Sequence, residues 1–166
     1  MALSTPFNLT QRGLTANAGV TTSLYPHSVV VNQTPVKTAS ARFNGVDATT
    51  VKGAALATSD VFQLVNVPAG AFVLQVVAKV VTAEGGTCTF DIGDGATVDG
   101  YIDGADGNAS TVVSSFDEDG TKTEAFGNGK FYSAADTIDL LLATGTAAKV
   151  VIDVTVTYIE TMPLTH

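Results

Sequence analysis

The chain has 166 residues, of which 45% are hydrophobic and only 14% are charged, with one cysteine and a net charge of −8 at pH 7. A single cysteine excludes an internal disulfide framework, and the acidic balance argues against nucleic-acid binding, because phosphate needs basic partners. The sequence contains neither an apolar run long enough to span a membrane nor a secretory signal at its start, so we expect the product to stay in the cytoplasm until it is assembled or released.

The low charged fraction, against about 25% in average globular domains, predicts a surface built from Thr, Ser, Asn and Gly or partly covered by partners. The charge is also divided unevenly. Residues 1–59 carry four bases and one acid (+3), whereas residues 60–166 carry 4 bases and 15 acids (−11). This asymmetry fits a docking arm on a differently charged body, or simply a Thr-rich segment that holds a few basic residues.

Residues 1–25 are predicted to form an extended arm, because they are polar and lack a sustained apolar period. If the arm lies across a neighbour, its anchors would be its isolated large apolar side chains, Phe7, Leu9, Leu14 and Leu24. Short strands are predicted at 29–31 and 39–43, the second ending at Asn44-Gly45, a hairpin turn signal.

The strongest strand signals follow from residue 60 onward. A strand at 61–67 leads into the longest one, 71–82, which is apolar on both faces: Phe72, Leu74, Val76, Ala78 and Val80 on one side, and Val73, Val77 and Val81 on the other. A strand of this kind is usually covered on both faces, so something beyond a simple two-layer sandwich is expected to cover it.

The remaining strands are predicted at 87–92, 110–116, 122–132, 137–142 and 149–160, with a long loop from residue 93 to about 108. Cys88 alternates with polar neighbours and is interpreted as a small buried hydrophobe. About eight strands at regular spacing predict an all-β fold, an antiparallel β-sandwich or jelly roll, whose strand order stays open. We predict two segments: 1–59, an extended N-terminal arm with the first short strands, and 60–166, the sandwich body.

The stretch Asp91–Asp106 contains five aspartates on a Gly-rich sequence. Clustered carboxylates suggest a hard cation such as calcium, but the spacing of known calcium loops is absent. Asp-Gly pairs also build tight turns, and we expect that role here, with no metal and no cofactor.

No residues form a credible catalytic constellation. The only histidines are His27, which follows a proline, and His166, the last residue, and neither is in a position that rigid neighbours would hold. The protein is therefore predicted not to be an enzyme.

The order of motifs from Asp60 to Ile159 resembles a known group of proteins. The motifs are Val67-Pro68-Ala69-Gly70, Asp91-Ile92-Gly93-Asp94-Gly95, Asp99-Gly100-Tyr101-Ile102-Asp103-Gly104 and Tyr132-Ser133-Ala134-Ala135-Asp136. They are similar to those of capsid decoration (cement) proteins of tailed bacteriophages, which have a jelly-roll body.

This resemblance implies a virion protein on the capsid surface, made in the host cytoplasm. Its partners would be copies of itself, as a homotrimer, and the major capsid protein, whose adjacent subunits it would clamp, with no nucleic acid or membrane involved. Two alternatives stay open: another phage component of the tail, baseplate or head fibre, and a carbohydrate-binding sandwich module, which the absence of Trp makes less attractive.

Overall fold

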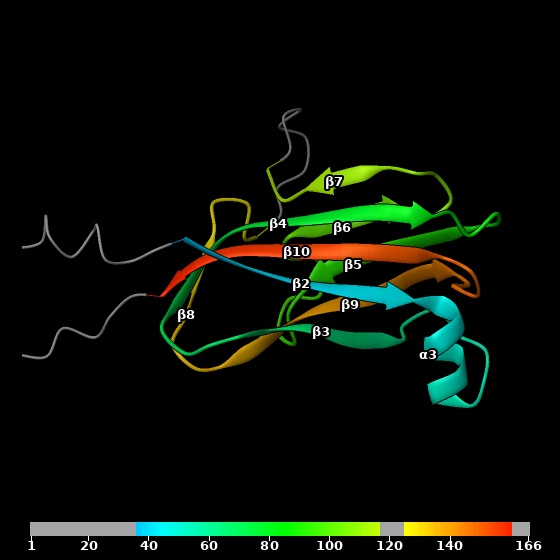
Figure 1. Cartoon of the computed structure of the whole chain (residues 1–166), viewed down its shortest axis with the longest axis horizontal. Coiled ribbons are helices and arrows are strands. Elements are labelled where there is room, and N and C mark those ends of the chain that lie inside the picture. Colours follow the sequence, from blue (N-terminus) through cyan, green and yellow to red (C-terminus); the bar gives the residue numbers. More distant parts are fainter. Residues whose placement is uncertain (1–35, 117–124, 161–166) are drawn as a thin grey trace, which may run out of the picture. The chain divides into compact units, whose positions relative to one another are not determined.

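The computed structural model describes residues 36–116 and 125–160, which contain nine strands and one helix (Figure 1). The elements are β2 Val36–Asn44, α3 Gly45–Lys52, β3 Val61–Val67, β4 Ala71–Thr82, β5 Cys88–Gly93, β6 Ile102–Asp106, β7 Val112–Ser114, β8 Lys130–Tyr132, β9 Asp136–Gly145 and β10 Val151–Glu160.

The strands form two antiparallel sheets, which confirms the predicted sandwich. One sheet has the order β2-β10-β4-β7, with β8 on another part of β4, and the second has the order β3-β9-β5-β6. Most consecutive strands lie in different sheets, as they do in a jelly roll. The core fills the space between the inner faces, where aliphatic and aromatic side chains such as Phe90, Ile92, Leu140 and Ile152 are buried.

The last strand alternates as its sequence predicts. In β10, Ile152, Val154 and Val156 are buried, whereas Asp153 and Thr155 are partly exposed on the outer face. The period of two therefore identified both the strand and its inner face.

The longest strand differs from its predicted pattern at one point. In β4, Ala71 and Val73 are buried on the same side as Val76, Ala78 and Val80. A register shift against β10, which pairs Tyr158 with Val73 but Thr157 with Gln75, accounts for this change of parity. Such a β-bulge inserts one residue, so the assignment of Val73 to the opposite face was wrong.

The expected hairpin turn at Asn44-Gly45 is instead the start of a helix. The Asn44 side chain accepts a hydrogen bond from the Val46 amide (3.0 Å) as the N-cap of α3, and Gly53 ends the helix with a φ of 72°. Gly45 is required, because a Cβ at this position would lie 1.8 Å from the carbonyl oxygen of Ala147. Asn is a preferred N-cap as well as a turn residue, so the local signal was ambiguous.

Three other boundaries also differ. The predicted loop 93–108 contains β6, which pairs with β5, and the predicted strand 110–116 is reduced to β7. Of the strand predicted at 122–132, only β8 is present among the described residues, and a turn precedes it. The arm 1–25 and the strand predicted at 29–31 lie outside the described residues.

The sandwich includes residues that the sequence analysis placed in the segment 1–59. β2 pairs with β10 along its whole length, from Val36 opposite Ile159 to Asn44 opposite Val151. The body therefore contains the first described strand together with α3.

Candidate interaction surfaces

The sheet β2-β10-β4-β7, called the β10 sheet below, has an outer face that is mainly polar in its middle. Arg42 binds Asp153 through two hydrogen bonds of 2.6 and 2.8 Å, and these bonds lower the pKa of the Asp153 carboxyl. In the next row Ser40 and Thr155 share a hydrogen bond of 3.0 Å. This face includes the Thr and Ser side chains that the composition predicted, and its ion pair contributes little to stability because water screens exposed charges.

One end of the same face is apolar. The strand registers place Val36 beside Ile159, Ile159 beside Phe72, and Phe72 beside Phe131, in one row across four strands. Val36 and Phe131 are exposed, and the other two are partly exposed. A continuous exposed apolar row of this kind is typical of an interaction surface.

A groove of about 650 Å³ lies between the edge strands β2 and β3, next to α3. The Phe43 and Phe62 rings, 4.8 Å apart between centroids, join the two sheets there. Val51 on α3 is 88% exposed and Val61 on β3 is 48% exposed. The groove is lined by Arg42, Phe43, Asn44, Asp47, Ala48, Val51, Val61, Phe62, Gln63 and Leu64.

The charges around this groove are nearly all neutralised in pairs. Lys52 binds Asp60, and Arg42 binds Asp153 on the adjoining face. Asp47 is exposed, and it makes no ion pair with any residue of the described part of the chain. The groove therefore combines apolar side chains with the polar Asn44 and Gln63 and with the Asp47 carboxylate, which has no ion-pair partner among the described residues.

A further surface with exposed apolar side chains, the β7 edge, lies at the edge of the sheet β2-β10-β4-β7 that is opposite β2 (Figure 1). We define it by Lys79, Val112 and Phe116. Val112 is 65% exposed and Phe116 is 52% exposed, and Val112 pairs in register with the exposed Lys79. Lys79 also lies opposite Asp153 of β10 in register, and its charge contributes, after Arg42, to lowering the pKa of that carboxyl.

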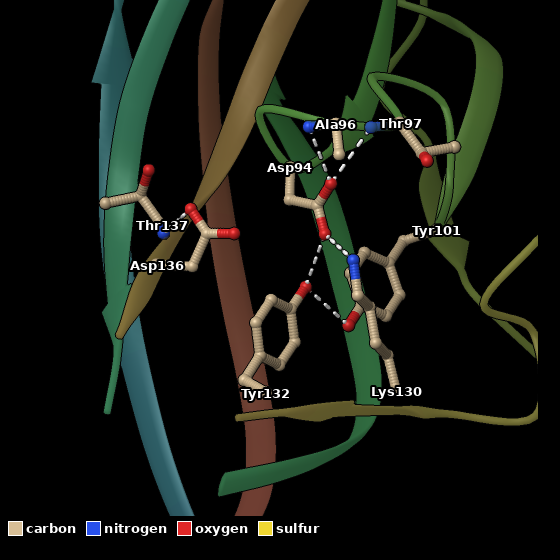
Figure 2. Close-up of polar contacts among 8 residues, drawn as sticks. All are labelled: Asp94, Ala96, Thr97, Tyr101, Lys130, Tyr132, Asp136 and Thr137. Atoms are coloured by element: carbon tan, nitrogen blue, oxygen red, sulfur yellow. Dashed lines mark hydrogen bonds and ion pairs between the residues drawn. The ribbon is translucent and has the colours of Figure 1, made fainter. Parts of the chain in front are cut away.

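The aspartate-rich loop is organised around one buried carboxylate, Asp94 (Figure 2). One of its oxygens accepts hydrogen bonds from the Ala96 and Thr97 amides (3.0 and 2.9 Å), and the other accepts from Tyr132 (3.0 Å) and forms an ion pair with Lys130. Burial raises the pKa of Asp94, but these donors together outweigh burial and leave that pKa below its usual value. The Asp94 carboxylate is thus saturated by the protein itself.

Two other acids of this stretch bind the backbone. Asp91 accepts a hydrogen bond from the Gly104 amide and Asp106 accepts one from the Asn108 amide, each 2.7 Å long. Across the residues that the structure describes, no three His, Cys, Asp or Glu side chains gather into a group that could hold a metal ion. These bonds support the interpretation of the Asp-Gly motifs as turn-building groups.

Two buried acids outside this loop were not anticipated. Asp139 is 5% exposed and lies on β9 between Gln63 of β3 and Gly93 of β5, and its Oδ1 accepts no hydrogen bond from any described residue. Burial raises its pKa, and the nearby charges of Asp136 and Asp94 add to this effect. Glu84 accepts hydrogen bonds from the amides of Ala148, Lys149 and Val150, so it holds the turn before β10. Sequence could identify both as acids but not as buried ones.

The structure also locates the other residues that the sequence analysis considered. Cys88 is a buried free thiol, as predicted, and burial raises its pKa to about 11. His27 and His166 lie outside the described residues. Among the described residues, no helix is sufficiently long and apolar to cross a membrane.

Comparisons with known proteins identify the fold by structure alone. No protein-family model matches the sequence, and no curated protein is significantly similar to it. The structure is similar to a chain of the "Cyanophage Pam1 capsid asymmetric unit", with a TM-score of 0.56 and 20% identity over 77% of this chain and 86% of that one.

A second similar structure comes from the "Capsid of Ralstonia phage GP4". The TM-score is 0.54 at 19% identity, again over 77% of this chain and 86% of the other. Both similarities concern the fold.

Proposed function

We propose that the chain is a non-enzymatic structural protein of a phage virion, which decorates and stabilises the capsid by clamping adjacent major capsid subunits. The observation that carries this proposal is the fold that the chain shares with chains of two phage capsids. The motif order from Asp60 to Ile159, which resembles that of cement proteins, supports it independently.

The exposed apolar surfaces fit a protein that acts through its interfaces. A monomeric soluble protein rarely leaves continuous apolar patches uncovered. Among its described residues this chain exposes one continuous row, Val36–Ile159–Phe72–Phe131, and further large apolar side chains in the groove and at the β7 edge. Stable protein interfaces bury about 1,200–2,000 Å² in total, and symmetric repetition over a capsid multiplies the effect of each one.

In this proposal the protein is a homotrimer on the capsid surface, and the segment 1–59 attaches it. Three of the four basic residues of that segment form ion pairs with acids of the sandwich: Lys37 with Glu160, Arg42 with Asp153 and Lys52 with Asp60. The proposed attachment therefore concerns the part of the segment that precedes β2. The apolar row lies at the end of the sheet where β2 begins and β10 finishes, and in this proposal it faces the capsid.

The test is attachment of the purified chain to capsids assembled from the major capsid protein of the same phage. We expect the full chain to sediment with these capsids and to raise their melting temperature. Deletion of residues 1–25 should preserve the circular dichroism spectrum and reduce co-sedimentation. An electron cryomicroscopy map of the virion that placed the chain in the tail or baseplate would refute the capsid assignment.

A further inference from the structure

A carboxyl group on the outer face of the sheet β3-β9-β5-β6 is buried where an acid is ordinarily exposed. On β9, Asp139 stands between Ile138 and Leu140, which both belong to the core. The alternation of a strand therefore directs Asp139 to the outer face. Asp139 is nevertheless only 5% exposed, and its Oδ1 accepts no hydrogen bond from any described residue. Burial without partners costs free energy, and it costs most when the group is charged.

The loop of residues 94–101, between β5 and β6, covers this part of the face. Gly93 of β5 lies opposite Asp139 in register, and a Cβ on Gly93 would lie 1.9 Å from the carbonyl oxygen of Thr97. The loop is held in this position by Asp94, whose carboxylate accepts hydrogen bonds from two amides of the loop (Figure 2). Opening of the 94–101 loop is therefore the local motion that would admit water to Asp139.

The Asp94 carboxylate also joins this loop to the exposed apolar row. Asp94 forms an ion pair with Lys130 and accepts a hydrogen bond from Tyr132 (3.0 Å), and both of these residues belong to β8 (Figure 2). Between them stands Phe131, which is 51% exposed and lies at the end of the row, opposite Phe72. A displacement of Asp94 would therefore loosen the strand that supports this end of the row.

We propose that Asp139 is the sensor of a pH-sensitive switch, which keeps the 94–101 loop and β8 in place when Asp139 is protonated and loosens both when it is ionised. The switch would regulate the surface that is proposed to face the capsid. The inference rests on the proposed function in that one respect, whereas the coupling of Asp139 to the loop and to β8 is a property of the fold.

The charges around Asp139 oppose its ionisation. Burial is the main cause that raises the pKa of Asp139, a hydrogen bond from Thr137 opposes this effect, and the charges of Asp136 and Asp94 raise that pKa further. β3 carries no charged residue. The other titratable groups on the neighbouring elements already have partners: Asp91 with the Gly104 amide, Lys130 and Tyr132 with Asp94, and Tyr101 with Tyr132.

The direction of the switch follows from linkage. A group whose pKa is raised in the folded state contributes stability that is present below its unfolded pKa and is lost as the pH rises through the folded one. The closed loop is therefore favoured in acid, and opening becomes easier towards neutral pH. Within 36–116 and 125–160, carboxyl groups are the side chains that ordinarily titrate between about pH 4 and about pH 7, because His27 and His166 lie outside these ranges.

Hydrogen exchange of the full chain, measured by NMR between about pH 4 and about pH 7, tests the switch. After correction for the intrinsic pH dependence of exchange, the protection of the Ala96, Thr97 and β8 amides should fall severalfold as the pH rises. Asp139→Asn, which cannot ionise, should keep this protection high and nearly constant. The matched control Asp99→Asn replaces an exposed acid of the same loop and should retain the pH dependence of the parent chain.

Three results would overturn the proposal. They are loop protection that does not change with pH in the parent, an Asp139→Asn variant that keeps the parent's pH dependence, and a loop that responds to pH while β8 does not. Circular dichroism checks the folding of each variant. Asp139→Ala also lacks the charge, and it takes the place of Asp139→Asn if the latter does not fold.

Co-sedimentation with capsids at the same pH values separates this inference from the proposed function. We expect the parent chain to bind capsids more tightly at the lower pH, and Asp139→Asn to bind them with little pH dependence. If the exchange results hold but the chain never binds capsids, the switch stands and decoration is refuted. If the chain binds capsids while the protection of its loop is independent of pH, decoration stands and the switch is refuted.

Discussion

Replacing Glu84 by Ala is expected to destabilise the sandwich more than any other single change of an acidic side chain outside the Asp94 cluster. The Glu84 carboxylate accepts three backbone hydrogen bonds, at 3.1 Å from Ala148 and at 2.7 and 2.9 Å from Lys149 and Val150. The Val150 donor is buried and cannot turn to water, whereas the other two belong to exposed residues and can rehydrate.

The magnitude follows from this difference. A buried donor left without an acceptor costs about 1–3 kcal/mol, and hydrogen bonds to a charged group contribute about 1.5–3 kcal/mol each. We count the hydrogen bond of the buried Val150 amide in full and those of the two exposed amides at a small fraction. The free energy of unfolding should then fall by about 3 kcal/mol. The Ala148-Lys149-Val150 turn also supports α3, since the Gly45 amide donates to the Val150 carbonyl (2.9 Å), so the groove should loosen too.

Urea denaturation of Glu84→Ala, followed by circular dichroism, measures the loss, and hydrogen exchange of the Val150 amide locates it. Glu84→Gln is the matched control: its single carbonyl oxygen can keep two of the three bonds, so it should lose about half as much. A Glu84→Ala variant within about 0.5 kcal/mol of the parent, with the Val150 amide still protected, would refute the reasoning.

Three further results are expected. Gly45→Ala should cost about 2 kcal/mol or more in denaturant melts, because its Cβ would lie 1.8 Å from a carbonyl oxygen, whereas Gly86→Ala, with no atom within 4 Å, should be near neutral. The pKa of Asp139 is raised in the folded state, so its contribution to stability is present below the unfolded pKa and is lost as pH rises through the folded one. Asp139→Asn should therefore raise the free energy of unfolding, measured in urea melts, at pH 7 and by progressively less towards pH 4. A stabilisation that grew as the pH fell would contradict the raised pKa of Asp139. With its pKa raised to about 11, Cys88 should react with a thiol reagent only after unfolding, and rapid labelling of the native protein would show that it is accessible.

The sequence predicted the features that depend on a two-residue period. The alternation in β10 and the turn at Pro68-Ala69-Gly70 identified strands, their inner faces and the sandwich class. The reversal within β4 could not be foreseen, because a bulge is a property of the pairing with β10 and not of the β4 residues. The helix α3 was missed because eight residues are too few to show a helical period.

The interaction surfaces were only partly predictable. The longest strand, predicted to be apolar on both faces, indicated that a partner was needed. Phe72 does lie in the exposed apolar row, although the prediction had grouped it with Val76, which is buried. The groove and the β7 edge each combine side chains from elements far apart in the chain, such as Asp47 with Val61 and Lys79 with Val112. No linear pattern brings such residues together, since the tertiary fold alone sets their distance.

The pairing of the first described strand with the last one has a kinetic consequence. Ser40 and Thr155, which share a hydrogen bond between β2 and β10, are 115 residues apart in the chain. Folds dominated by such non-local pairs have a high contact order and fold slowly, because a long loop must close before its contacts can form. While the chain is being synthesised, β2 and β4 have no shared neighbour until β10 has left the ribosome. The sheet β2-β10-β4-β7 can therefore be completed only after β10 has been synthesised, so both strands that flank β10 must wait for it.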